Sequence, residues 1–395
     1  MSAGHEWPTV KLGDVLTPVR ESEFFPNPGA ERFVTVKLHG QGAVERGISA
    51  GKTPVAFTGF RIQAGQFIYS RIDARNGAFA IVPSELDGAV VSKDFPVFEI
   101  NERRCSPRYL EHFARTGRLT ANAKAFSQGA TNRQRIKEKT LLRFKFPLPP
   151  LPEQRRIAGI LGKASASVTS RQTLHFKMNE LRDRSFNRFH TKHTQGSTPI
   201  SFKDLVLQIE NGRSPVCESR EAEKDEWGIL KLSAVTSGEF KSHENKALLQ
   251  DSNALKNFEV HPGDLLMTRK NTPELVGAVA LVRKTRGRLL LPDLIYRLRL
   301  NQELVEAEYF RALLMSAPVR ARIRALAGGS SQSMSNISKQ RLNQLVMSIP
   351  PLSDQREFVL QSEKIYRLQD RNTEALKLTQ ELHASLAARA FSGQL

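Results

Sequence analysis

The sequence predicts an α+β protein built as a tandem duplication, in which each half joins a region of short strands and helices to one long helix. Two observations carry this prediction: a repeat with a period of about 200 residues, and a Pro-Pro segment before a long helical stretch at the end of each half. The length of 395 residues agrees with two or more domains, because single hydrophobic cores rarely grow beyond about 250–300 residues.

The repeat consists of ordered echoes between the two halves. Residues 148–155, LPPLPEQR, return as 349–356, IPPLSDQR, with an offset of 351 − 150 = 201. Residues 64–71, AGQFIYSR, return as 262–269, PGDLLMTR, with an offset of 263 − 65 = 198. Five echoes in register are hard to obtain by chance, so the chain is a tandem duplication. The three shorter echoes are 36–38 with 230–232, 107–110 with 307–310, and 180–181 with 381–382.

Short apolar runs broken by Gly and Pro fill about the first 145 residues of each half, and such runs predict strands and turns. A helical stretch follows at 107–122 and 302–327, and then a polar Gly/Ser loop at 127–132 and 328–335. In the first half the predicted strands are 33–38, 67–69, 79–82 and 97–100.

A long helix closes each half and begins just after the Pro-Pro pair. Proline is tolerated in a first helical turn, and Glu153 and Asp354 suit the positive end of the helix dipole. Apolar or small residues at steps of four and three predict a coiled-coil seam, interrupted by Arg171 and Asn372. Residues 153–190 would span about 57 Å as one helix. The predicted seam is Ile157, Leu161, Ala164, Val168, Met178, Leu181 and Ser185, and then Ile365, Leu368, Ala375, Leu382 and Ser385.

The composition favours a polyanionic partner. The net charge is +19, from 59 Lys and Arg against 40 Asp and Glu, and such an excess points first to nucleic acid. Cys105 and Cys217 are far apart in sequence, which excludes a disulfide framework or a paired-cysteine zinc site. With neither a signal pattern nor an apolar run of about 20 residues, we expect no membrane association and a reducing, cytoplasmic location.

Several motifs, in their order along the chain, resemble those of the specificity (S) subunit of type I restriction–modification systems. Residues 149–158, PPLPEQRRIA, resemble the opening of that family's first long helix, and the C-terminal LAARAFSGQL resembles its usual ending. Further support comes from KLGDV at 11–15, NGRSP at 211–215, and GDLL at 263–266 followed by GAVA at 277–280. The sequence departs from the pattern at Ser353-Asp354-Gln355 and at Phe186–Phe189.

The resemblance implies a specific architecture. Two target-recognition domains of mixed strands and helices would be separated by two long antiparallel coiled-coil helices, with pseudo-two-fold symmetry. The implied boundaries are 1–150 for recognition domain 1, 151–194 for the first long helix and a linker, 195–351 for recognition domain 2 and 352–395 for the second helix.

The function implied is DNA sequence recognition without catalysis. Each domain would read one half of a bipartite asymmetric site on double-stranded DNA, and two-fold symmetry suits two half-sites at a fixed spacing. Two methyltransferase subunits would dock on the helices, and restriction/translocase subunits would join them. We expect no cofactor or metal in this chain; S-adenosylmethionine and ATP would belong to the partner subunits.

Candidate DNA-binding residues lie where a strand ends in basic and amide side chains, because Arg, Lys, Asn and Gln can contact phosphates and base edges. In the first half they are Arg71, Arg75 and Asn76, and their counterparts in the second half are Arg269, Lys270 and Asn271. The polar loops add Gln128, Thr131, Asn132, Arg133 and Arg135, and then Gln332, Ser333 and Asn336. In contrast, Gln154 and Gln355 are expected to cap or pack.

Three alternative functions compete with this hypothesis: a nuclease or methyltransferase with its own recognition domains, a structural coiled-coil adaptor, and an orphan DNA-binding regulator. Motif-like patterns give the enzyme little support. Residues 47–53, GISAGKT, are one residue short of a phosphate-binding loop, and His190-x-x-His193 in a polar stretch predicts a linker rather than a metal site. Glu244-x-Lys246 is a pattern common by chance.

Overall fold

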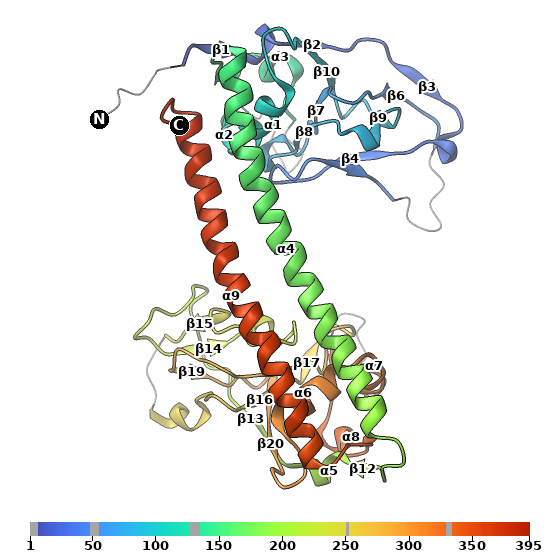
Figure 1. Ribbon diagram of the computed structural model, residues 1–395, viewed down its shortest axis with the longest axis vertical. Helices are drawn as coiled ribbons and strands as arrows, with labels where there is room; N and C mark the ends of the chain where they lie inside the picture. Colours follow the sequence, from blue (N-terminus) through green and yellow to red (C-terminus); the bar gives the residue numbers. More distant parts are fainter. Residues whose placement is uncertain (1–6, 48–54, 127–134, 250–252, 329–333) are drawn as a thin grey trace. The chain divides into compact units, whose positions relative to one another are not determined.

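The computed structural model describes residues 7–47, 55–126, 135–249, 253–328 and 334–395. By its contacts the chain divides into two compact units. Unit 1 consists of residues 1–173 and 373–395, and unit 2 of residues 174–372 (Figure 1). Each unit therefore contains a part of both long helices, and the four-part domain division stays a prediction.

Unit 1 is built on a four-stranded antiparallel sheet in the order β2-β10-β7-β8. These strands are β2 (Leu16–Pro18), β10 (Val97–Ile100), β7 (Phe67–Tyr69) and β8 (Phe79–Ile81). The short helix α3 (Glu138–Leu141) precedes β11 (Lys145–Pro147), which pairs with β1 (Thr9–Lys11). A smaller sheet holds β3 (Glu23–Phe25), β6 (Phe57–Arg61) and β9 (Val90–Ser92), and β4 (Val34–Val36) pairs with β5 (Ala43–Glu45).

Unit 2 repeats the four-stranded sheet in the same order, β13-β20-β16-β18. These strands are β13 (Val206–Asn211), β20 (Ile295–Leu300), β16 (Leu265–Thr268) and β18 (Val279–Leu281). The terminal pair recurs as β12 (Ile200–Ser201) with β22 (Val346–Met347), and α5 (Phe202–Leu205) and α8 (Lys339–Leu342) are short helices. The second sheet holds β15 (Asn245–Ala247), β14 (Gly228–Leu230) and β19 (Leu289–Leu290), and β17 (Lys270–Asn271) pairs with β21 (Ser335–Asn336).

Each predicted short helical stretch is two helices rather than one. In unit 1 they are α1 (Pro107–Arg115) and α2 (Arg118–Phe126), and in unit 2 α6 (Ala307–Met315) and α7 (Ala317–Ala325). Gly117, at a φ of +80°, separates the first pair; glycine adopts this left-handed conformation without steric cost. Ser316 is extended between α6 and α7, and Pro318 lies in the first turn of α7.

The long helices α4 (Leu151–His193) and α9 (Leu352–Ala390) begin where the Pro-Pro pairs predict. Both carry a fully buried glutamine four residues after the second proline, Gln154 and Gln355. The Gln154 side-chain amide donates to the carbonyls of Arg104 and Pro149, each at 2.8 Å, and its oxygen accepts from the Ser106 amide at 2.8 Å. This glutamine therefore connects the chain before α1 to the start of α4, which agrees with the expected capping or packing role.

Gln355 makes the same three contacts in unit 2. Its amide donates to the carbonyl oxygens of Leu304 at 3.0 Å and Pro350 at 2.9 Å, and its oxygen accepts from the Glu306 amide at 2.9 Å. The repeat is therefore present in individual hydrogen bonds as well as in the order of elements.

The two long helices run antiparallel to each other within each unit. In unit 1, Arg156 donates to the Leu395 carbonyl at 2.7 Å, and Ser165 Oγ lies 3.2 Å from His383 Nε2. In unit 2, Gln369 donates to Asn179 Oδ1 at 2.6 Å, and His193 Nδ1 lies 2.8 Å from Asp354 Oδ2.

The predicted helix seam is partly wrong. Ile157 and Leu161 are buried as expected, but Leu181, Leu368 and Leu382 are more than half exposed. The buried positions one residue away are polar, namely Arg182, Gln369 and His383, the last only partly buried. Because hydrogen bonds and ion pairs fill much of the seam, a search for apolar residues shifts it by one position.

The predicted linker at His190 and His193 is also wrong, because α4 extends to His193. His190 Nδ1 lies 2.7 Å from the Tyr309 hydroxyl. His193 stacks on Phe189 with ring centroids 4.3 Å apart, in addition to its contact with Asp354. Tertiary contacts thus hold a polar sequence in a helix that its composition alone does not predict.

Candidate nucleic-acid interface

The first candidate arginine, Arg71, lies directly after β7. Its amide donates to the Asp94 carbonyl and its carbonyl accepts from the Ile136 amide, both at 2.9 Å. This pairing brings the segment that follows the polar loop, beginning with Arg135, beside the end of β7. The Arg71 side chain is 32% exposed, and its guanidinium pairs with Glu138 at 2.5 Å. Two of the predicted loci in unit 1 are therefore adjacent in space.

Arg269, the repeat counterpart of Arg71, has the same backbone setting in unit 2. Its amide donates to the Leu294 carbonyl at 2.8 Å, and its carbonyl accepts from the Ile337 amide at 3.0 Å. Its guanidinium lies over the Tyr296 ring, 5.7 Å from the centroid, instead of pairing with a carboxylate. The same strand end thus presents an arginine in both units, with a different side-chain environment in each.

Other candidates in unit 1 surround Arg71. Arg75 and Asn76 lie in the 3-10 turn Ala74–Asn76 and are half-buried, and the Asn76 carbonyl accepts from the His39 amide at 2.7 Å. Arg135 is 55% exposed and pairs with Asp94 at 3.3 Å. Of these three side chains, Arg135 is the most accessible to an external partner.

In unit 2, Lys270 and Asn271 form β17, opposite Asn336 and Ser335 of β21. Lys270 is half-buried. Asn271 is only 8% exposed, and its side-chain oxygen accepts from the Thr272 amide at 2.9 Å. Contact of Asn271 with a base edge stays a prediction, and its burial means that it would need local rearrangement. The candidates Gln128, Thr131, Asn132, Arg133, Gln332 and Ser333 lie outside the described residues.

Two tyrosines that the sequence analysis missed hold these segments in place. The Tyr69 hydroxyl donates to the Ile136 carbonyl at 2.9 Å, and the Tyr296 hydroxyl donates to the Ile337 carbonyl at 3.1 Å. The carbonyls are repeat counterparts, 337 − 136 = 201, but the tyrosines are not. Met267 stands at the Tyr69 position, and Tyr296 lies opposite Met267 on the neighbouring strand. Repeat alignment therefore hides this contact.

Neither cysteine has the environment of a nucleophile. Burial raises the pKa of Cys105 to about 12 and also raises the pKa of Cys217. Across the described part of the chain, no three His, Cys, Asp or Glu side chains converge as metal ligands would. The nuclease-like Glu244 instead accepts a hydrogen bond from Ser233 Oγ at 2.6 Å. Residues 48–54, most of the phosphate-loop-like segment, lie outside the described residues.

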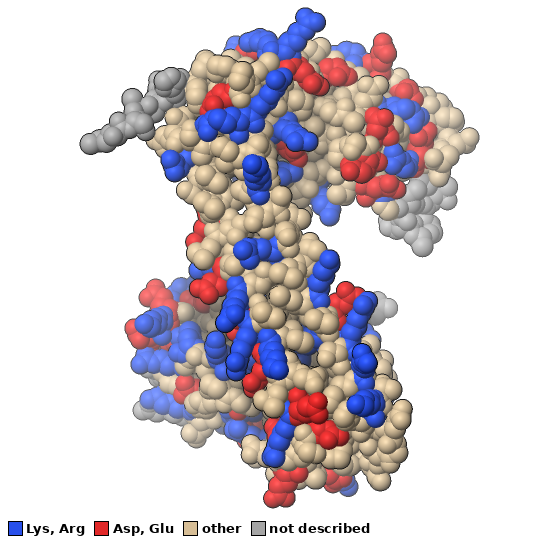
Figure 2. Space-filling model, in the orientation of Figure 1, with Lys and Arg blue, Asp and Glu red and all other residues tan. Residues whose placement is uncertain are grey.

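Basic side chains also gather on the long helices in unit 2 (Figure 2). Arg184, Arg188 and Lys192 are exposed at steps of four along α4 and so share one helix face. A groove of about 460 Å³ runs along this face, bordered by Leu181 and by Glu357 of α9. This stripe is a second group of basic side chains, carried by a long helix rather than by a strand end.

No helix in the described ranges combines the length and the apolar character that a bilayer crossing requires.

Comparison with known proteins indicates which family these features match. Residues 4–175 match the model of the type I restriction modification DNA specificity domain. The EcoEI specificity subunit of Escherichia coli is 30% identical over 185 residues, covering 47% of this chain and 31% of that protein. The EcoKI specificity subunit of Escherichia coli strain K12 is 26% identical over 314 residues, covering 73% and 65%. The chain spans less than two thirds of the length of either relative.

A solved structure is similar in fold. The type I restriction–modification S subunit from M. genitalium matches over 99% of this chain and 97% of its own, with 11% identity and a TM-score of 0.58. This likeness confirms the predicted α+β class.

Proposed function

We propose that this chain, which is similar to type I restriction–modification specificity subunits, is the DNA sequence-recognition subunit of such an enzyme. It binds a bipartite, asymmetric site on double-stranded DNA, one half with residues 1–150 and the other with residues 195–351. The observation that carries the proposal is the repetition of one sheet in both units, with an arginine at the same strand end in each.

Charge supports DNA as the ligand. The net charge is +19, so Lys and Arg side chains are in excess for contacts with DNA phosphates. Such contacts contribute much of the affinity for DNA and make DNA binding weaken steeply as the salt concentration rises. Arg135 and the α4 stripe provide exposed cations, whereas Arg71 and Arg269 are partly enclosed and suited to positioned contacts.

Differences between the units support two unlike half-sites. In unit 1 the smaller sheet is antiparallel throughout, whereas in unit 2 β14 and β19 are parallel. Base readout depends on side chains placed by such variable segments. A conserved frame with different attachments therefore suits a site whose halves differ in sequence.

The exposed faces of the long helices support docking of partner subunits. Several large apolar side chains are exposed there, and exposed apolar surface of this kind is found at protein–protein interaction sites. We assign these faces to two methyltransferase subunits, which supply S-adenosylmethionine chemistry, with ATP-dependent restriction/translocase subunits joining in the cytoplasm. This chain itself is not the enzyme, which agrees with relatives named specificity subunits. The exposed positions are Leu174, Phe176, Leu181, Leu360, Leu368, Leu378 and Leu382.

The experiment is co-expression of the chain with its neighbouring methyltransferase, followed by mapping of methylated sites in host DNA with long-read sequencing. The expected result is one split motif with two unlike halves around a fixed, unread spacer. Exchange of residues 1–150 for those of another family member should change one half only. A stable complex without new methylation would overturn recognition and favour the adaptor or the regulator; methylation by the chain alone would favour the enzyme.

Variants of the strand-end arginines test the interface at single residues. R71Q should lower the preference for the correct bases in the first half of the methylated motif only, and R269Q in the second half only. Each loss should be roughly tenfold if one good bidentate contact to a base is removed. R20Q is the matched control for R71Q, because Arg20 pairs with the same Glu138 at 2.9 Å but is 73% exposed. Equal effects of R20Q and R71Q would show that loss of the Glu138 ion pair, rather than loss of a DNA contact, is responsible.

A further inference from the structure

Unit 1 contains a cavity of about 320 Å³ where α1 and the start of α2 meet α4 and α9. Its polar wall is formed by His112, Arg115, Arg118 and His383, and Leu161 and Ala387 contribute apolar surface. No carboxylate is among the side chains that line it. The cavity therefore combines positive charge with an apolar wall.

One polar side chain in this wall lacks an internal partner. His112 is 8% exposed and borders the cavity, and its imidazole forms no hydrogen bond with any described residue. Buried polar groups in proteins are generally hydrogen-bonded, so such an exception calls for an explanation. Its position on the cavity wall leaves it open to a partner that enters from outside.

The repeat shows what occupies the equivalent place in unit 2. Offsets of 201 on the long helices relate His383 to Arg182, Ser165 to Tyr366 and Ala387 to Phe186. Contacts support this correspondence, because Ser165 touches His383 and the Arg182 guanidinium lies 5.2 Å from the Tyr366 ring centroid. Unit 2 thus has the larger side chains Tyr366 and Phe186 at the positions that Ser165 and Ala387 occupy in unit 1.

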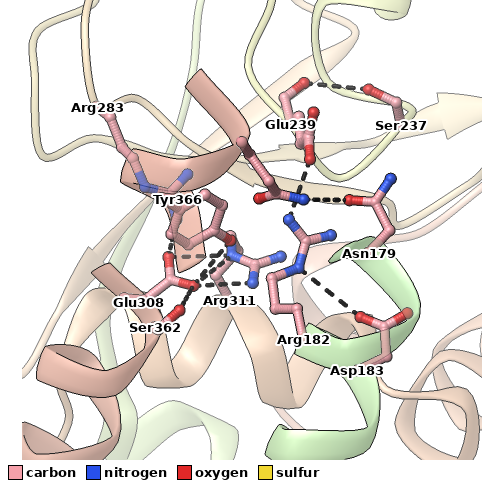
Figure 3. Close-up of polar contacts among 11 residues, drawn as sticks. Asn179, Arg182, Asp183, Ser237, Glu239, Arg283, Glu308, Arg311, Ser362 and Tyr366 are labelled. Atoms are coloured by element: carbon pink, nitrogen blue, oxygen red, sulfur yellow. Dashed lines mark hydrogen bonds and ion pairs between the residues drawn. The ribbon is translucent and has the colours of Figure 1, made fainter. Parts of the chain in front are cut away.

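The filled site in unit 2 is organised around a buried carboxylate (Figure 3). Glu308 accepts hydrogen bonds from Arg311 at 2.8 Å, from the Tyr366 hydroxyl at 3.0 Å and from Ser362 at 3.3 Å, and it pairs with Arg283. Burial alone would raise the pKa of Glu308, but the two arginines outweigh it and hold the pKa below its usual value.

Unit 1 has no such internal carboxylate. The counterpart of Glu308, at an offset of 200, is Arg108, which is exposed. The counterpart of Arg311 is Glu111, which pairs with the wall residue Arg115 at 2.5 Å but does not itself line the cavity. The equivalent site in unit 1 thus keeps cationic groups and lacks the anion.

We propose that the unit 1 cavity is a binding site for an aliphatic carboxylate that takes the place of the internal carboxylate of unit 2. Arg115 and Arg118 supply N–H donors that are not all used, because a guanidinium has five and Arg118 spends one on the Phe391 carbonyl at 3.2 Å. His112 donates the further hydrogen bond, and the aliphatic stem lies against Leu161 and Ala387. The carboxylate comes either from a free dicarboxylate anion or from a glutamate side chain of a partner protein.

Charge coupling in the cavity agrees with this assignment. Burial, together with Arg115, His383 and Arg108, lowers the pKa of His112 to about 4, and burial and Arg115 lower the pKa of His383. A bound carboxylate adds the opposite charge next to these rings and must raise their pKa values. By linkage, carboxylate binding then strengthens as the pH falls, down to about pH 4.3, where an aliphatic carboxylate itself takes up a proton.

The test uses NMR of the full-length chain with labelled histidine, titrated with glutarate at constant ionic strength. We expect saturable shifts of the His112 and His383 ring resonances, assigned with H112N and H383Q, and none with sodium chloride. A387F introduces at this position the aromatic side chain that its unit 2 counterpart, Phe186, has, and it should abolish saturable glutarate binding. R115A should weaken binding by at least tenfold. R367A is the matched control, because Arg367 also pairs with a glutamate four residues earlier.

The proposal is overturned if chloride gives the same shifts, or if A387F and R115A bind glutarate as the unaltered chain does. A photo-reactive residue at Ala388 in the complex with the methyltransferase distinguishes the two sources. A cross-link to an acidic partner segment identifies a protein side chain; glutarate saturation without a cross-link identifies a free anion. Because the readout is in unit 1 alone, failure here leaves DNA recognition untouched, and the reverse also holds.

Discussion

Units 1 and 2 share the same arrangement of strands and helices, but the side-chain contacts are conserved between them to a different extent in three regions. At the start of the long helices the same residue makes the same three hydrogen bonds, through Gln154 and Gln355. Beside the strand-end arginines, both units have a hydrogen bond from a tyrosine hydroxyl to the carbonyl of Ile136 or Ile337. The tyrosine is Tyr69 of β7 in unit 1 but Tyr296 of β20, the strand next to the counterpart of β7, in unit 2. Beside the long helices the contents differ completely, with a cavity in one unit and a buried ion cluster in the other.

This gradient shows which constraints are strict. A backbone amide and two carbonyls buried at a fixed point need one side chain of the right shape, and a glutamine meets that need. A single carbonyl oxygen can accept a hydrogen bond from a hydroxyl on either of two adjacent strands. A buried space can be filled by charge, by aromatic rings or by a ligand, provided that charges are compensated.

The largest expected difference between the units comes from R311M. It leaves Glu308 buried with fewer donors, and loss of one partner of a buried pair costs about 3–5 kcal/mol. E111Q, at the equivalent position of unit 1, breaks a partly exposed pair and should cost less than about 1 kcal/mol. Urea unfolding measures both, with Trp227 as the probe of unit 2 in a W7F chain and Trp7 as the probe of unit 1 in a W227F chain.

Q154A and Q355A should be nearly equal in effect. Each removes three hydrogen bonds and leaves backbone groups buried without partners, at a cost of about 2–3 kcal/mol. The same two single-tryptophan chains report each unit separately. A difference of more than about 1 kcal/mol between the two variants would break the equivalence of the two joints.

Acid should destabilise unit 1 through His112. Its pKa in the folded chain is lowered to about 4, so the unfolded chain binds a proton first as the pH falls. The stability from neutral His112 is complete above about pH 6.5 and is lost between about 6.5 and 4, by at most about 1.4 kcal/mol per pH unit. H112N should flatten this part of the unfolding profile of the W227F chain; an unchanged slope would contradict the assignment.

Y69F and Y296F should have the smallest effects on stability, about 1 kcal/mol each for one lost hydrogen bond. Under the proposed function they should have a second effect, because each hydroxyl holds the segment beside a strand-end arginine. Methylated-site mapping should then show relaxed sequence preference in the first half of the motif for Y69F and in the second half for Y296F. Relaxation of both halves by one variant would contradict a local positioning role.

Much of the fold could be predicted because the repeat, the strand runs and the Pro-Pro helix starts are local or periodic features. The predicted helix seam differs from the observed one by one position because Arg182, Gln369 and His383 occupy seam positions where apolar residues are usually sought. The helical state of His190 and His193 depends on Tyr309 and Asp354, which are distant in sequence.

For the candidate site, strand-end arginines could be predicted from the repeat, but their partners could not. Glu138 lies 67 residues after Arg71, and nothing in its sequence context marks it as an ion-pair partner. The tyrosine exchange between strands is invisible to alignment because the two residues do not correspond. Tertiary geometry decides both features.

The paired glutamine joints also bear on how such a protein can evolve. Residues 149–155 and 350–356 form the same joint. Recombination between two related genes within either segment would therefore exchange the sequence on one side and keep the hydrogen bonds of the joint. The joint then acts as a splice point at the protein level. Under the proposed function, new combinations of recognition halves arise in a single genetic event, while the helix faces assigned to partner subunits are inherited unchanged.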